Sequence, residues 1–187
     1  MSLKSIMLAA LFTSGALCAS AKDYHYTTVP GDAMQTRIYT LDNGLKVYMS
    51  VNKEKPRLQV NIAVKTGSRN DPAETTGLAH YLEHLMFKGT KKFGTIDAAK
   101  EKPYLDEITR RYEYDKLMSS IGSEGTNAYT SNDVTCYVEN IPNNEIENWA
   151  KVQSDRFQNM VIRGFHTELE AVYEEKNISM ASDATKE

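Results

Sequence analysis

Hydrophobic and polar residues alternate along two segments near the start of the chain, residues 37–41 and 45–51. Alternation with a period of two is typical of a half-buried β-strand, and the Asn43-Gly44 pair between the two segments is a strong turn signal. Residues 58–66 continue the alternation, with Leu58, Val60, Ile62 and Val64 on one face. The pattern therefore predicts three consecutive strands, of which the first two form a hairpin.

A helical pattern follows the polar residues 67–75. It predicts a helix from about Gly77 to Lys88, with Thr76 as the N-cap and Gly89 as the stop. One side of this helix carries Leu78, Leu82, Leu85 and Met86, and the opposite side carries His80, Glu83, His84 and Phe87. Because a surface helix buries one apolar stripe, we expect the leucine side to pack on the sheet. The histidine side would then face a second surface or a cleft.

The second half of the chain alternates between helix and strand patterns. Residues 97–120 are rich in charged residues and indicate a solvated helix that is interrupted near Pro103. Residues 128–130 and 134–139 predict two further strands, and a final helix begins near Phe165. Between them, Asn143 or Asn144 can cap a helix that reaches Met160, with an apolar stripe of Ile146, Trp149, Ala150, Phe157 and Met160. On this stripe Trp149 is expected in the core rather than at a ligand site.

This order of strands, helices, strands and helices predicts the α+β class: a two-layer sandwich with helices packed on a mainly antiparallel sheet. The length of 187 residues allows one such domain with a sizeable core. A formal net charge of -3 and the absence of a basic stripe argue against nucleic acid as a partner.

The first 21 residues have the features of an export signal. Lys4 precedes an apolar stretch at residues 6–17, and Ala19-Ser20-Ala21 is an A-x-A cleavage site. The stretch is too short to cross a bilayer, so we expect no membrane span after residues 1–21 are removed. The sequence therefore predicts a domain at residues 22–187 that is exported to a bacterial periplasm or secreted. Removal of the signal leaves Cys136 as the single cysteine, which excludes an intramolecular disulfide.

The strongest chemical signal is the H-x-x-E-H motif formed by His80, Glu83 and His84. Residues three and four apart on a helix are neighbours on one face. Two neutral imidazoles one turn apart can share a divalent cation, and a carboxylate between them is placed to handle a proton. The motif is the inverted form of the H-E-x-x-H motif of zinc peptidases. The alternative, two solvated or structural histidines, explains this spacing poorly.

A catalytic zinc takes three protein ligands and keeps one open position for water, so two histidines leave one ligand to be found. The last helix offers four carboxylates, Glu168, Glu170, Glu174 and Glu175. Glu168 and Glu175 lie two turns apart on one face, with Val172 between them, but spacing alone does not choose among the four. His25 and His166 lie outside any ligand-spaced pattern. The same ligand types can also accept manganese or cobalt.

Three blocks of the sequence resemble the signature of the pitrilysin/insulinase family of zinc metallopeptidases. The first is residues 77–90, which read G-L-A-H-Y-L-E-H-L-M-F-K-G-T, with Gly67 before them. The second is residues 127–131, N-A-Y-T-S, followed by Asp133, Thr135 and Tyr137. The third is Glu168-x-x-x-Val172-x-x-Glu175. The blocks occur in the order that the family has and span most of the chain beyond the signal.

This resemblance implies a role for each of several residues. His80, His84 and Glu175 would be the zinc ligands, Glu83 the catalytic base, and Glu168 a carboxylate that supports the site. The strand formed by Asn127, Ala128, Tyr129 and Thr130 would be the edge along which a substrate peptide lies as an added strand. The implied function is that of a zinc-dependent endopeptidase domain.

The resemblance further implies a homologous partner domain, related to this one by duplication. The Arg and Tyr that the family's partner half contributes to the site have no recognisable counterpart in the sequence, and the chain ends soon after Glu175. We therefore expect a fragment, or one subunit of a split enzyme, that binds zinc but hydrolyses peptides weakly by itself. Three alternatives stay open: a catalytically silent member of the family, a protein that binds zinc and peptides without cleaving them, and a different metallohydrolase with the same ligands.

Overall fold

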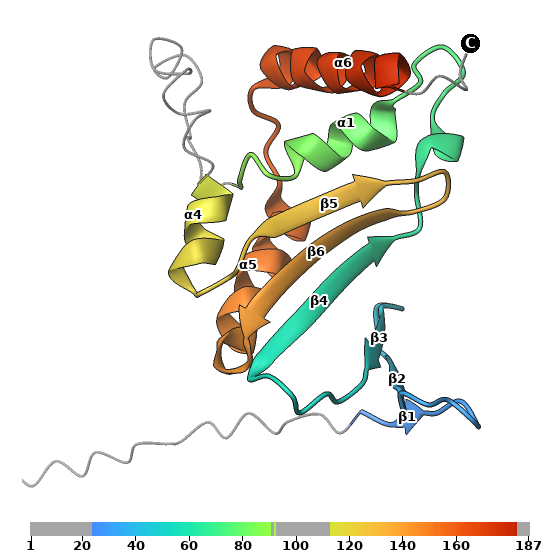
Figure 1. Ribbon diagram of the computed structural model, residues 1–187, viewed down its shortest axis with the longest axis vertical. Helices are drawn as coiled ribbons and strands as arrows, with labels where there is room; N and C mark the ends of the chain where they lie inside the picture. The colour runs from blue at the N-terminus through green and yellow to red at the C-terminus, as the bar shows by residue number, and fades with distance from the viewer. Residues whose placement is uncertain (1–23, 91, 93–112, 183–187) are drawn as a thin grey trace, which may run out of the picture. The chain divides into compact units, whose positions relative to one another are not determined.

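The computed structural model describes residues 24–90, 92 and 113–182 (Figure 1). The chain divides into two compact units between Glu54 and Lys55. The predicted signal at residues 1–21 and the charged residues 97–112 lie outside the described ranges. No helix within the described ranges is both long and apolar enough to cross a membrane.

The first unit contains a three-stranded antiparallel sheet in the order β1-β2-β3. The strands are β1 (Tyr26–Thr27), β2 (Arg37–Thr40) and β3 (Lys46–Met49). Gly44 turns the β2–β3 hairpin with a φ of 86°, a backbone conformation that glycine adopts without strain. The hairpin predicted from Asn43-Gly44 is therefore confirmed.

The second unit contains a second three-stranded antiparallel sheet, in the order β4-β6-β5. Its strands are β4 (Arg57–Val64), β5 (Thr126–Thr130) and β6 (Thr135–Pro142), which confirms the three strands predicted here with ends shifted by up to three residues. Because β6 is the central strand, it is the most buried of the three. The register places the four apolar residues of β4 on the same face as Thr135, Tyr137, Glu139 and Ile141 of β6.

Within its described residues, the second unit also contains six helices. They are η1 (Ser68–Asn70), α1 (Leu78–Leu85), α4 (Glu113–Ser120), η3 (Asn143–Glu145), α5 (Ile146–Asn159) and α6 (Phe165–Ser182). Of these, α1, α4 and α5 pack against this sheet. Helix α1 contacts β5 and β6 on one side and α6 on the other, so it lies between α6 and the sheet (Figure 1). This arrangement confirms the α+β class with helices packed on an antiparallel sheet.

The start of α1 is held by a residue that the sequence pattern did not indicate. The predicted cap by Thr76 is wrong, because the N-cap is Gly77 at a φ of 97° and its position has no side-chain cap. Instead the Asp71 carboxylate accepts hydrogen bonds from the backbone N–H groups of Gly77, at 2.7 Å, and Ala79, at 2.9 Å. The loop before the helix folds back, so the capping side chain comes from six residues before the N-cap.

Replacing Asp71 with alanine is expected to lower the free energy of unfolding by about 1 to 2 kcal/mol, because two helix N–H groups lose their acceptor. Urea denaturation followed by circular dichroism measures the change. Glu74→Ala in the same loop is the matched control, since Glu74 is exposed. Equal midpoints for the two variants would contradict this account of the cap.

The histidine side of α1 faces a second surface, α6, as predicted, but the predicted packing of the leucine side on the sheet is wrong. Leu78 and Leu82 are exposed, at 49% and 44%, whereas Tyr81 and Leu85 pack against Val172 of α6. Glu83 is buried and directed at the sheet, where it meets Thr130. A single apolar stripe describes a helix with one buried side, but α1 is buried on two sides.

The main core of the second unit lies between the sheet and helices α4 and α5. Tyr114, Met118 and Ile141 form its centre, and Trp149 packs against them as predicted. The predicted α5 stripe is wrong at Ile146, Ala150 and Phe157, which are exposed. The residues buried instead are Gln153, Asp155 and Arg156, and Met160 is half-buried. The predicted cap at Asn143 or Asn144 is also wrong, since those residues form η3 and α5 has no side-chain cap.

Arg156 is fully buried, and aromatic rings together with a carboxylate compensate its charge. The guanidinium lies 4.3 to 4.5 Å from the ring centroids of Phe87, Tyr114 and Tyr137. It donates to the Met86 carbonyl oxygen at 2.9 Å and pairs with Glu139 at 3.6 Å. Burial of this cation is physically acceptable because ring faces and an anion replace water around it.

Candidate metal centre

Backbone contacts join the segment that follows α1 to the segment that leads into α6. Thr90 and Met160 form an antiparallel bridge, and the Val161 N–H donates to the Gly89 carbonyl at 3.3 Å. Arg163 donates to the carbonyl oxygens of Lys88 and Thr90, at 3.3 and 2.8 Å. The segment after α5 is thereby fixed to the segment after α1, so that α6 starts beside α1.

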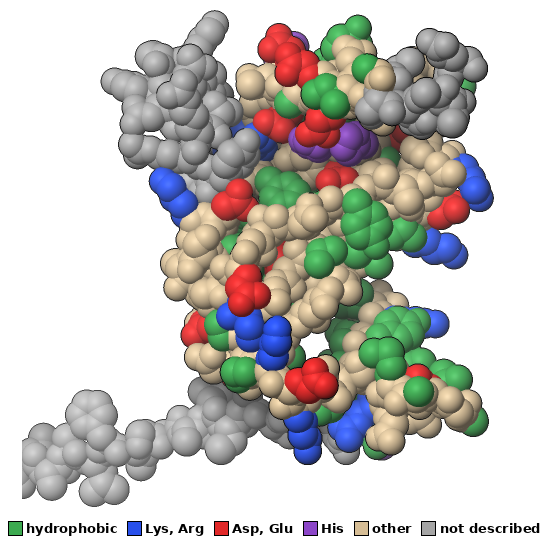
Figure 2. All heavy atoms as spheres, viewed as in Figure 1, with side chains coloured by type: hydrophobic (Ala, Val, Ile, Leu, Met, Phe, Trp, Pro, Cys, Tyr) green, Lys and Arg blue, Asp and Glu red, His purple; other side chains and the backbone are tan. Residues whose placement is uncertain are grey.

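The facing sides of the two helices then pack together. The Tyr81 hydroxyl donates to the Phe165 carbonyl, and Tyr81 and Leu85 pack on Val172. Glu168 and Glu175 lie one turn before and one turn after Val172, so both carboxylates reach α1. Figure 2 shows histidine and acidic side chains gathered together at this surface.

His80, His84 and Glu175 are brought together by this packing. The Nε2 atoms of the two histidines lie 3.3 Å apart, and Glu175 Oε2 lies 3.5 Å from each of them. In a tetrahedral site with zinc–ligand bonds of about 2.0 to 2.1 Å, neighbouring ligand atoms are about 3.3 Å apart. The three atoms therefore have the spacing that three ligands of one zinc ion require.

The structure also distinguishes among the other candidates from the sequence. In the described part of the chain, only His80, His84 and Glu175 form a group of three that could hold an ion. Glu170 and Glu174 are exposed on α6. His166 stacks edge-on against Phe165, and His25 belongs to the first unit.

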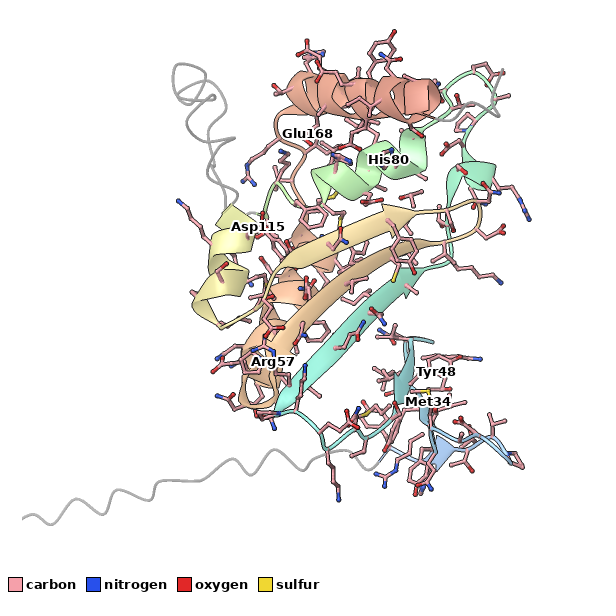
Figure 3. All side chains as sticks on the ribbon, in the orientation of Figure 1. Met34, Tyr48, Arg57, His80, Asp115 and Glu168 are labelled. Atoms are coloured by element: carbon pink, nitrogen blue, oxygen red, sulfur yellow. The ribbon has the colours of Figure 1, made fainter. Side chains whose placement is uncertain are left out.

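Glu168 contacts His84 and is largely buried; Figure 3 labels it on α6, above the helix that carries His80. Its Oε2 is 3.3 Å from His84 Nδ1, and its Oε1 pairs with the Lys88 ammonium. Burial would raise the pKa of Glu168, but the hydrogen bonds from His84 and Lys88 outweigh it and hold the pKa below its ordinary value. An ionised Glu168 accepts the Nδ1 proton, which leaves Nε2 of His84 with its lone pair toward Glu175 and His80.

Glu83 occupies the opposite side of the motif, facing the sheet. The Thr130 hydroxyl donates to Glu83 Oε2 at 2.5 Å. Thr130 is 3.2 Å from the hydroxyl of Thr135, which in turn donates to the Thr66 carbonyl at 2.9 Å. The Glu83 carboxylate is therefore fixed in direction by the last residue of β5.

The predicted substrate strand, Asn127 to Thr130, is part of β5. Among the described strands β5 is at the edge of its sheet, because only β6 pairs with it. The Ser131 N–H donates to the Val134 carbonyl, on the β6 side of the strand. Because backbone groups alternate in direction along an antiparallel strand, those of Ala128 and Thr130 point away from β6. In agreement, the Ala128 N–H donates to Oδ1 of the adjacent Asn127 side chain, at 2.9 Å, and not to β6. Within the described residues, an open edge thus ends next to Glu83.

Sequence reasoning missed the contribution of Lys88 and the contact between Thr130 and Glu83. Lys88 stands inside the first block that resembles the zinc metallopeptidases, but a lysine after a helix is usually solvated. Thr130 was predicted only through the substrate strand. Neither pairing has a local sequence signal, because each partner comes from a distant element.

The chain is similar to known proteins. A model of the insulinase family of peptidases, peptidase family M16, matches residues 46–186. The chain is 33% identical over 127 residues to a probable mitochondrial-processing peptidase subunit beta of Arabidopsis thaliana, covering 68% of this chain and 21% of that protein. It is 27% identical over 148 residues to the uncharacterized zinc protease YmxG of Bacillus subtilis, covering 78% and 32% respectively.

The fold is shared with solved structures as well. A protease from Helicobacter pylori superimposes with a TM-score of 0.63 at 27% identity, over 76% of this chain and 31% of that one. The chain thus spans a third or less of the length of the relatives it matches. Since the family model covers more than half of the chain, the chain belongs to the insulinase family of peptidases, family M16.

Proposed function

We propose that this chain is the metal-binding part of a zinc-dependent endopeptidase. His80, His84 and Glu175 would hold the ion, and the observation that carries the proposal is the triangle of 3.3 and 3.5 Å among their ligand atoms. The Bacillus subtilis relative is named a zinc protease, which supports the choice of metal. Two imidazoles and one carboxylate leave the fourth position of a tetrahedral ion open for water.

Glu83 is the proposed catalytic base. A bound zinc would lower the pKa of its water to about 7 and polarise the peptide carbonyl. Glu83 lies between His80 and His84 in the motif but is not one of the three grouped ligands, so it would act on the bound water rather than hold the ion. Thr130 holds Oε2, and the carboxylate accepts the proton of the water and returns it to the departing amine.

The proposed substrate is an extended peptide segment on the open edge of β5. The outward backbone groups of Ala128 and Thr130 would pair with the peptide as a further strand. Because Thr130 also contacts Glu83, a peptide in this register would have a peptide bond near the base. Backbone pairing of this kind selects for extended or unfolded segments rather than for a folded surface.

A second homologous domain or subunit is the proposed partner. Peptide hydrolysis develops a negative charge on the oxygen of the attacked carbonyl. A zinc ion would stabilise part of this charge, and hydrogen-bond donors normally stabilise the rest. Among the described residues, the contacts of the three ligand atoms are with one another and include no arginine or tyrosine hydroxyl. The relative from Arabidopsis thaliana is by its name one subunit, and the chain spans 21% of it.

We further propose that residues 1–21 direct export and are removed. The charged start, apolar stretch and A-x-A site of the sequence support this proposal. N-terminal sequencing of the protein from cells is expected to begin at Lys22. An intact Met1 in the mature protein would contradict it.

The proposed function predicts metal-dependent hydrolysis. The purified chain is expected to hold one zinc per chain, measured by mass spectrometry of the metal, and to cleave a mixture of fluorogenic peptides slowly. A chelator should abolish the cleavage and added zinc should restore it. Glu170→Ala, an exposed residue on the same helix, should leave both measurements unchanged. Cleavage that survives complete removal of the metal would overturn the proposal.

A further inference from the structure

Lys88 is a buried cation that the proposed chemistry does not use. It follows the end of α1, and its side chain is only 8% exposed. A buried ammonium is costly unless an anion compensates it, so its partner has to be held in place as well. Its Nζ pairs with Oε1 of Glu168, whose side chain is 11% exposed.

The Glu168 carboxylate divides its two oxygens between two partners. Oε1 meets the Lys88 ammonium, and Oε2 meets Nδ1 of His84 at 3.3 Å. The Nε2 atom of the same imidazole lies 3.3 Å from His80 Nε2 and 3.5 Å from Glu175 Oε2. The contacts therefore run without a gap from Lys88 through Glu168 and His84 to the three proposed ligand atoms.

The backbone of Lys88 is fixed independently of its side chain. Its N–H donates to the Leu85 carbonyl at 3.1 Å, and its carbonyl accepts from Arg163 at 3.3 Å. Arg163 belongs to the segment that leads into α6. The lysine thus projects from a fixed point onto the first turn of the helix that supplies Glu168.

Two contacts on opposite oxygens fix the plane of a carboxylate, whereas one contact leaves it free to rotate. Without the ammonium, Oε1 of Glu168 would be a poorly solvated anionic oxygen, and the side chain would turn toward water. This rotation weakens the bond to Nδ1, which sets the tautomer and the direction of the His84 ring.

We propose that Lys88 is a positioning residue for the metal centre: it locks Glu168 in the orientation in which Glu168 presents Nε2 of His84 to the ion. This inference rests on the proposed zinc site. It adds Lys88 to the contacts that orient the ligand His84 through Glu168. Loss of a partner that orients a ligand typically lowers metal affinity about 10- to 100-fold.

A double-mutant cycle on the full chain tests the inference, with zinc affinity measured by competition with a chromogenic chelator. Lys88→Met is expected to weaken zinc binding by about tenfold or more. In a Glu168→Gln background, Lys88→Met should cause no further loss, because the group it positions is already gone. Lys92→Met is the matched control, since Lys92 pairs with Asp155 and is 76% exposed.

Two further readouts separate positioning from a merely structural role. Nitrogen chemical shifts of His84 in the zinc-free chain are expected to show the Nδ1–H tautomer in the wild type and a mixture of tautomers in Lys88→Met. Lys88→Arg keeps the charge, so this variant should keep both the zinc affinity and the single His84 tautomer of the wild type. Lys88→Gln removes the charge and should lose both. If Lys88→Met does not fold, the comparison of Lys88→Arg with Lys88→Gln decides the question.

The outcomes distinguish this inference from the proposed function. If the wild-type chain does not bind zinc through His80 and His84, the proposed function fails. If the wild type binds zinc there and Lys88→Met and Lys88→Gln bind it equally well or more tightly, the role of Lys88 alone is overturned.

Discussion

Glu83→Gln is expected to remove peptide hydrolysis while leaving the zinc in place. Glutamine has the same shape and can still accept the Thr130 hydroxyl bond, but it cannot take a proton from water near neutral pH. Loss of a general base typically lowers the rate about 10²- to 10⁴-fold. The measurement pairs the initial rate on fluorogenic peptides with the zinc content of the same sample.

The control for this experiment is Glu170→Gln, which changes an exposed carboxylate on α6. A protein that binds zinc and peptides without cleaving them would give the same result for both variants. Loss of zinc from Glu83→Gln would place Glu83 among the ligands. Retained hydrolysis would show that another group serves as the base.

Arg156→Met is expected to lower the free energy of unfolding by about 3 to 5 kcal/mol, because it leaves Glu139 as an uncompensated buried anion. Glu139 is 4% exposed and accepts hydrogen bonds from Tyr114, Trp149 and Gln153. These donors connect α4, α5 and β6, so the loss should be felt through the whole core of the second unit. Urea denaturation measures it.

Lys151→Met on the exposed side of α5 is the matched control and should cost little. Adding Glu139→Gln to Arg156→Met should recover part of the stability, since no buried charge is then left unpaired. A loss of less than about 1 kcal/mol for Arg156→Met would contradict this account of the buried charge pair.

Local periodicity predicted most of the secondary structure, because the strands and helices are formed by patterns that need only neighbouring residues. The hairpin at Gly44 and the start of α6 at Phe165 are examples. Periodicity failed where burial depends on two surfaces at once. Leu82 is exposed and Glu83 is buried because α1 lies between the sheet and α6, and no single stripe describes such a helix.

The candidate site divides in the same way. His80, Glu83 and His84 are close in sequence, so helical geometry alone brings them together. Glu175 could not be separated from its neighbours by spacing, since its position depends on how α6 docks on α1. Only the resemblance to a family selected it, and the structure then brings it within 3.5 Å of both histidines.

Charged residues in the interior are the part that sequence reasoning could not supply. A lysine or arginine is usually solvated, so Lys88 and Arg156 gave no sign of their burial. Each is stabilised by groups from distant elements, Glu168 on α6 and Glu139 on β6. Such pairs become visible only when the tertiary contacts are known.

A structure of the zinc-loaded chain at the zinc absorption edge tests the central claim most directly. We expect one ion bound by His80 Nε2, His84 Nε2 and an oxygen of Glu175, each at about 2.0 to 2.2 Å. An ion bound elsewhere, or an ion at the two histidines without Glu175, would contradict the account.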